Sequence, residues 1–182
     1  MQVNTINGEG SPLFSLRGVS MFDYSLNQSS PVASYVDGAY KGSILLFGVE
    51  LYDLNSVEVL RGPQGTLYGG AINFISTPPG FDTTASVRLG FGNYNRREAE
   101  GAVQTALTDQ LAVRVAFTFT EADGVVKNIL PGQPDLQGVD QFGVRVSALY
   151  QVLDDLDVTL RYSKSRQNPV NYANIADNIA TG

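Results

Sequence analysis

Apolar and polar side chains alternate with a period of two through most of the second half of the chain, and this pattern restricts the fold most. Every second residue is apolar, and its neighbours are mostly polar or small, in four segments: 85–92, 111–121, 142–150 and 156–164. Segment 97–107 repeats the pattern less regularly. A period of two is typical of a β-strand with one apolar and one polar face. The sequence therefore predicts five strands of about 8–11 residues, close to the roughly 9–11 residues of a tilted strand that crosses a bilayer.

Each of the four regular segments carries one arginine on its polar face. These are Arg88, Arg114, Arg145 and Arg161. In a lipid-embedded barrel the opposite choice of faces would place them in hydrocarbon, at a cost of roughly 2–4 kcal/mol each near the middle of the bilayer. For a barrel, the alternation therefore predicts that the apolar residues of 113–119 contact lipid and that Arg114 faces the lumen.

The connections between the segments have the lengths of an antiparallel meander. Stretches 108–110 and 151–155 are short, as periplasmic turns of a barrel are, whereas 122–138 is long and rich in proline, as an outer loop would be. On periodicity alone a soluble antiparallel sheet with one solvated face fits equally well. The pattern thus predicts the strands and leaves their surroundings open.

Composition excludes several classes of protein. Cys and His are absent from the 182 residues, which removes disulfides, thiolate metal sites and the commonest metal ligand and general base. The net charge of −6 argues against a nucleic acid as partner. No apolar run reaches the roughly 18 residues of a transmembrane helix. The first residues do not form a basic and then apolar leader, so we expect either a soluble chain or one whose true beginning is missing.

Residues 1–80 have a different pattern, with short apolar runs joined by long irregular stretches. Strands are predicted at 13–18, 31–36, 57–61 and 71–75, and a helical turn at 50–55. Asp37-Gly38 is a dipeptide favoured in tight turns, and Pro63 and Gly65 predict a second turn. These elements indicate a small α+β unit.

The stretch from Val57 to Gly69, VEVLRGPQGTLYG, resembles the signature of the plug domain of TonB-dependent outer-membrane receptors. Three shorter stretches resemble other plug segments, namely SLRG at 15–18, YVDG at 35–38 and LYDL at 51–54. Stretches 92–95 and 107–116 resemble the first strands of the receptor barrel. The sequence departs from the family at one point. Members usually carry a few more residues between Gly69 and the glycine that opens the next strand, whereas here Gly70 follows Gly69 directly.

The resemblance implies a mainly β fold in two parts. Residues 1–80 would be a small α+β plug domain whose N-terminal part is missing. Residues 81–182 would be an antiparallel meander that begins a transmembrane β-barrel and leaves it incomplete, since transporters of this kind have about 22 strands around the plug.

The resemblance also implies a function, which is active uptake of a scarce nutrient across the outer membrane, where the protein would contact lipid. Substrate would bind to the plug apex and outer loops, and TonB, grasping an N-terminal box absent from this chain, would drive displacement of the plug. A ferric siderophore is the first expectation for the substrate, with cobalamin, saccharides and other nutrients left open. No bond is made or broken, so we predict no enzyme activity, no catalytic residue, no cofactor and no metal site.

Candidate site residues follow from the same resemblance. Residues of two aromatic, irregular loops are expected at the plug apex in contact with substrate, namely Phe22, Tyr24, Asn27, Gln28, Tyr40 and Lys41. Arg17 and Arg61 are expected to hold the plug by pairing with glutamates of the inner barrel wall. Their simpler role is to satisfy carbonyls at strand ends.

Two alternatives remain. The first is a soluble or surface β-rich binding module without transport activity, which merely contains a plug-like segment. The second is a β-sandwich enzyme, which the absence of His, Cys and a clustered pair of carboxylates disfavours.

Overall fold

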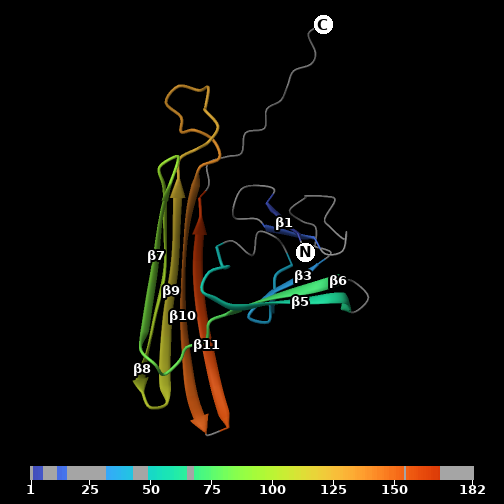
Figure 1. The fold of residues 1–182 in the computed structure, drawn as a ribbon, viewed down its shortest axis with the longest axis vertical. Coiled ribbons are helices and arrows are strands. Elements are labelled where there is room, and N and C mark those ends of the chain that lie inside the picture. Colours follow the sequence, from blue (N-terminus) through green and yellow to red (C-terminus); the bar gives the residue numbers. More distant parts are fainter. Residues whose placement is uncertain are drawn as a thin grey trace.

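The computed structural model describes residues 2–5, 12–15, 32–42, 49–64, 68–153 and 155–168, and these form three sheets (Figure 1). A two-stranded antiparallel sheet pairs β1 (Gln2–Thr5) with β2 (Pro12–Ser15). A four-stranded sheet has the order β4-β3-β6-β5, and a five-stranded sheet has the order β11-β10-β9-β8-β7. We call these the small sheet and the large sheet. The described residues contain no helix, and therefore none that is long and apolar enough to span a membrane.

The large sheet confirms all five strands predicted from the alternation. They are β7 (Thr84–Gly92), β8 (Arg96–Thr108), β9 (Leu111–Ala122), β10 (Val139–Leu153) and β11 (Leu156–Gln167). Each strand pairs antiparallel with its neighbour in sequence, so the sheet is a simple meander. The turn at 109–110 and the C-terminal end of β10 lie at one end of the sheet, and the long connection 123–138 lies at the other (Figure 1).

One face of the large sheet is apolar and open. The register aligns Gly101 of β8 with Phe117 of β9, and Phe117 with Val144 of β10, so the apolar sets of neighbouring strands share a face. Val87 is 69% exposed and Leu160, at the opposite edge of the sheet, is also 69% exposed. The predicted alternation of faces is therefore present, and the arginines occupy the other face.

The small sheet is mixed and packs around its own core. Its strands are β3 (Ala33–Val36), β4 (Ala39–Tyr40), β5 (Leu54–Gln64) and β6 (Tyr68–Ser76), with β3 parallel to β6. The buried side chains of Val32, Val36, Ile72 and Phe74 form the centre of this core. The predicted tight turn at Asp37-Gly38 joins β3 to β4, with φ of 50° and 79°. In Figure 1, β5 and β6 run across the long axis of the large sheet.

Two local predictions for this region were wrong. The helical turn expected at 50–55 does not form, because β5 begins at Leu54 and Asp53 before it has a φ of 50°. The turn expected at 62–65 does not begin at Gly62, because β5 continues to Gln64 with a shift of register between Arg61 and Gln64. Pro63 lies in this irregularity on an edge strand, where a residue without an N–H group costs no ladder hydrogen bond.

Candidate functional site

The two larger sheets meet through charged side chains that project from consecutive strands of the large sheet. Each of the strands β8 to β11 contributes one, and they are Glu100, Arg114, Arg145 and Arg161 in that order. Their partners are residues 50–53, which we call the contact segment, and Asp37 of the β3–β4 turn. This interface between the sheets is the candidate functional site.

Asp53 makes the most extensive contact of the interface. Its carboxylate accepts two hydrogen bonds from Arg114, at 2.9 Å from Nε and 2.5 Å from Nη2. The two side chains are only 10% and 12% exposed, and Arg114 Nη1 also donates to the side chain of Gln104 at 2.8 Å. A two-pronged pair of this kind is stronger and more directional than a single contact, because both oxygens match the guanidinium plane.

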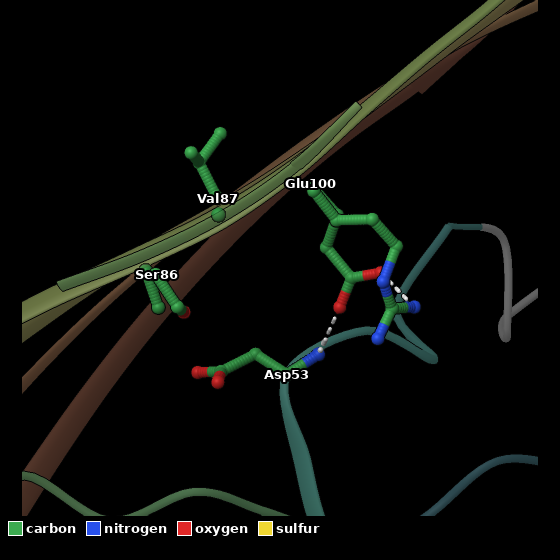
Figure 2. Close-up of a pocket in the computed structure, with 7 residues that line it drawn as sticks. Asp53, Ser86, Val87 and Glu100 are labelled. Carbon is green, nitrogen blue, oxygen red and sulfur yellow. Dashed lines mark hydrogen bonds and ion pairs between the residues drawn. The ribbon is translucent and has the colours of Figure 1, made fainter. Parts of the chain in front are cut away.

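The backbone at Asp53 completes a second contact. Its amide donates to Glu100 Oε1 at 3.3 Å, as Figure 2 shows. The φ of 50° at Asp53 belongs to the left-handed region, which aspartate tolerates better than most residues. Beside this contact lies a cavity of about 150 Å³, which Asp53 and Glu100 line together with Ser86 and Arg88. Arg88 lies 3.7 Å from Glu100 with a side chain that is 84% exposed, so it adds little to the interface.

Arg145 lies at the centre of the interface and is 3% exposed. Its guanidinium donates to the carbonyls of Tyr52 at 3.0 Å and Glu50 at 2.7 Å, and lies 4.6 Å from the centre of the Tyr52 ring. Main-chain carbonyls and an aromatic face therefore surround this charge. Removing the arginine would leave two carbonyls of the contact segment without these donors.

Burial raises the pKa of the Tyr52 phenol to about 12, against the opposing effect of nearby Arg145. The phenol therefore stays protonated above the pH at which an ordinary tyrosine ionises, near pH 10. Ionisation of a tyrosine changes its ultraviolet absorbance. We expect the difference in absorbance between the protein and its Tyr52→Phe variant to change only near pH 12, where Tyr52 ionises. A difference that titrates near pH 10 would contradict the burial of this side chain.

Asp37 anchors the other end of the interface. Its carboxylate accepts hydrogen bonds from the amide and hydroxyl of Ser76, at 2.8 and 2.7 Å, and lies 3.8 Å from Arg161 of β11. The first two bonds fix the β3–β4 turn to the end of β6. The third is a longer, partly exposed contact to the large sheet.

The predicted apex residues are only partly within the described ranges. Tyr40 is 44% exposed, and its ring centre is 5.6 Å from that of Tyr35. Lys41 pairs with Glu50 at 2.8 Å, with side chains 20% and 18% exposed, so this candidate residue contacts the contact segment directly. Phe22, Tyr24, Asn27 and Gln28 lie outside the described residues, and their role stays a prediction.

The predicted arginine contacts also stay predictions. Arg17 lies outside the described residues, and only the backbone of Arg61 is described. For these two residues we expected plug arginines to pair with glutamates of the barrel. In the described interface the arginines belong to the large sheet, and they contact carboxylates and carbonyls of the contact segment and the carboxylate of Asp37. Arg114, Arg145 and Arg161 lie on the polar face, as the alternation predicts. Their partners Asp37, Glu50 and Asp53 are not among the predicted site residues.

The described ranges hold no cluster of three or more His, Cys, Asp or Glu side chains that could bind a metal ion. The charged groups of the interface are instead used to pair one sheet with the other. The site is thus suited to holding two parts of a protein together through polar contacts.

A small mixed sheet is thus held by ion pairs and hydrogen bonds against the polar face of an antiparallel meander whose other face is apolar, which is the arrangement expected of a plug domain against a barrel wall. The profile of the TonB-dependent receptor plug domain matches residues 1–73. The chain belongs to the family of TonB-dependent receptors.

Three similar proteins illustrate the family. The pesticin receptor of Yersinia pestis is 32% identical over 142 residues, which are 73% of this chain and 21% of that receptor. The vitamin B12 transporter BtuB of Vibrio vulnificus is 26% identical over 187 residues, covering 96% of this chain and 29% of that transporter. The crystal structure of the ferric yersiniabactin uptake receptor FyuA of Yersinia pestis superposes with a TM-score of 0.75 at 27% identity, covering 90% of this chain and 27% of that structure. The chain therefore spans only a fifth to a third of the length of these relatives.

Proposed function

We propose that this chain forms the plug and the first barrel strands of a receptor for active uptake of a nutrient across the outer membrane. Residues 1–80 would be the plug domain, and residues 81–182 would begin the barrel. The observation that supports this proposal is that the large sheet has a polar face, which binds the small sheet, and an apolar face, which is exposed. An apolar face of this extent is unfavourable in water and favourable against lipid.

The chemistry of the interface suits a plug that has to move. Tyr52 packs against Ala102 and Ala116 of the large sheet, and the charged and main-chain groups of the interface meet through hydrogen bonds and ion pairs. When the interface opens, both groups of each polar contact become solvated, so contacts of this kind allow a reversible association. We infer that TonB supplies the force that separates the contact segment from the barrel wall.

A ferric siderophore is the substrate that we propose first, because the similar FyuA structure is that of a ferric yersiniabactin uptake receptor. A vitamin such as B12 is the second candidate, on the similarity to BtuB. The proposed function is binding and transport, in keeping with a family of transporters rather than enzymes, and requires no catalytic residue.

Uptake measurements test the proposal. A strain that lacks the gene for the intact receptor is expected to lose accumulation of one labelled ferric siderophore, and deletion of TonB should have the same effect. Accumulation that is independent of both genes for every iron complex and for B12 would contradict the proposal. A protein found in the soluble fraction would favour a β-rich binding module instead.

Two substitutions test the predicted apex. In the intact receptor, Tyr24→Ala and Tyr40→Ala are expected to weaken substrate binding about tenfold, through loss of aromatic contact area, without lowering receptor abundance. Tyr150→Ala is a matched control, because Tyr150 is 46% exposed and lies near the C-terminal end of β10, away from the long connection and the apex. Unchanged affinity in both apex variants would mean that these tyrosines are ordinary loop residues.

A further inference from the structure

Glu50 belongs to two sets of contacts at once. Its carboxylate pairs with Lys41 Nζ at 2.8 Å, beside the β4 strand that carries Tyr40. Its carbonyl accepts a hydrogen bond from the buried Arg145 at 2.7 Å, on the side of the large sheet. A displacement of Glu50 toward or away from Lys41 therefore acts on the contact with β10.

Both ends of this connection are anchored. The amide of Lys41 donates to the carbonyl of Ser34 at 2.8 Å, which fixes the main chain of Lys41 beside β3. Three residues beyond Glu50, Asp53 is held by Arg114 through its carboxylate and by Glu100 through its amide. The contact segment thus extends from one ion pair with the small sheet to another with the large sheet, and the Lys41 pair limits where Glu50 can lie.

The Lys41–Glu50 pair is accessible enough to be exchanged. Its side chains are 20% and 18% exposed, whereas those of Asp53 and Arg114 are 10% and 12% exposed. An ammonium group has three donors and no fixed plane, so it accepts a different carboxylate or another anion without a strict geometry. An incoming anion that replaces Glu50 leaves Lys41 paired, whereas a cation or a neutral group would leave it unpaired.

We propose that Lys41 is an anion site that Glu50 occupies in the ligand-free protein, and that an anionic group of the substrate displaces Glu50 and loosens the contact segment from the large sheet. The ligand class is an anionic chelate, whose carboxylate, phenolate or similar oxygen takes the place of Glu50. This inference rests on the proposed function, because it requires a ligand that reaches the Tyr40–Lys41 side of the small sheet.

Hydrogen exchange of the Asp53 amide in the intact receptor tests the coupling without any ligand. This amide donates to Glu100, so it reports whether the contact segment stays on the large sheet. Lys41→Met and Glu50→Gln each remove the ion pair while the carbonyl that binds Arg145 remains. Both are expected to speed exchange of the Asp53 amide about tenfold, which corresponds to about 1.4 kcal/mol. Lys127→Met, at an exposed lysine of the 123–138 connection, is the control and should leave the rate unchanged.

Citrate serves as the anion probe, compared with sodium chloride at equal ionic strength. In the wild-type receptor citrate is expected to speed exchange of the Asp53 amide, and in Lys41→Met it should have no effect. Wild-type exchange in both Lys41→Met and Glu50→Gln would overturn the coupling. The anion site would be overturned if citrate did not speed exchange of the Asp53 amide in the wild type, or if it sped exchange equally in Lys41→Met. If Lys41→Met does not assemble, the nearly isosteric Glu50→Gln decides both points, because its exchange should already be fast without citrate and citrate should not speed it further.

Failure of this inference can be distinguished from failure of the proposed function. If uptake of every tested substrate is independent of the receptor gene while the exchange response is present, the transport function is contradicted and the coupling is retained. If uptake is confirmed but the exchange rate of the Asp53 amide is unchanged in Lys41→Met and Glu50→Gln, only this inference is contradicted.

Discussion

Replacing either Asp53 or Arg114 by alanine is expected to weaken the hold of the small sheet on the large sheet by roughly 3–5 kcal/mol, because one charge is left nearly buried without its partner. The pair has two hydrogen bonds and side chains that are 10% and 12% exposed, so water cannot easily replace the missing group. The double replacement should cost roughly 1–3 kcal/mol less than the sum of the single ones. Native-state hydrogen exchange of the amide at position 53, which donates to Glu100 across the interface, measures the opening free energy in the intact receptor.

A second ion pair of the same types provides the control. Arg166 and Asp140 lie 3.2 Å apart on β11 and β10, with side chains 68% and 33% exposed. Exposed pairs contribute only about 0–1 kcal/mol, because water and salt screen them. A coupling between Asp53 and Arg114 that is no larger than the coupling between Arg166 and Asp140 would show that the interface does not depend on this pair.

The large sheet could be predicted from sequence because its signal is local. Each strand repeats the same two-residue period, and its turns fall where the period breaks, so the boundaries followed to within a few residues. The face that carries Arg114, Arg145 and Arg161 could be predicted for the same reason, since a strand places alternate side chains on opposite faces. That the other face contacts lipid stays a prediction.

The contact segment could not be predicted, because its conformation depends on residues far away in the chain. Residues 50–55 carry a pattern compatible with a helical turn, yet Asp53 is held by Arg114 and Glu100, which follow it by 61 and 47 positions. The acceptors of Arg145 are the carbonyls of Glu50 and Tyr52. Every residue has a carbonyl, so the sequence contains no signal for which ones a buried arginine will use. The carboxylate of Asp53, in the plug-like stretch at 51–54, is the one partner that a search for counter-ions could have found.

The path of β5 shows a related limit. Pro63 and Gly65 predicted a turn that begins at Gly62, which is the usual result of such residues. The strand continues through Pro63 because β5 is the edge of the small sheet and pairs on one side only. Which strand forms an edge is a property of the whole sheet and could not be read from residues 57–69.

If the apolar face contacts lipid, Leu160→Arg is expected to prevent assembly of the receptor in the membrane, and Thr159→Arg is expected to permit it. Leu160 lies on the apolar face of β11 and is 69% exposed, and Thr159, its neighbour, lies on the polar face and is also exposed. Leu160→Arg would bring a charge into hydrocarbon at roughly 2–4 kcal/mol near the middle of the bilayer, whereas Thr159→Arg would add one more arginine to the face that carries Arg161.

The comparison distinguishes lipid from water because both positions are open in the described structure. In water neither substitution buries a charge, so both variants should assemble equally well. In a membrane Leu160→Arg should sharply reduce the heat-modifiable, folded receptor in the outer-membrane fraction, and Thr159→Arg should retain most of it. Equal amounts of the two folded variants would mean that the apolar face is solvated, and the large sheet would then belong to a β-rich binding module rather than to a barrel.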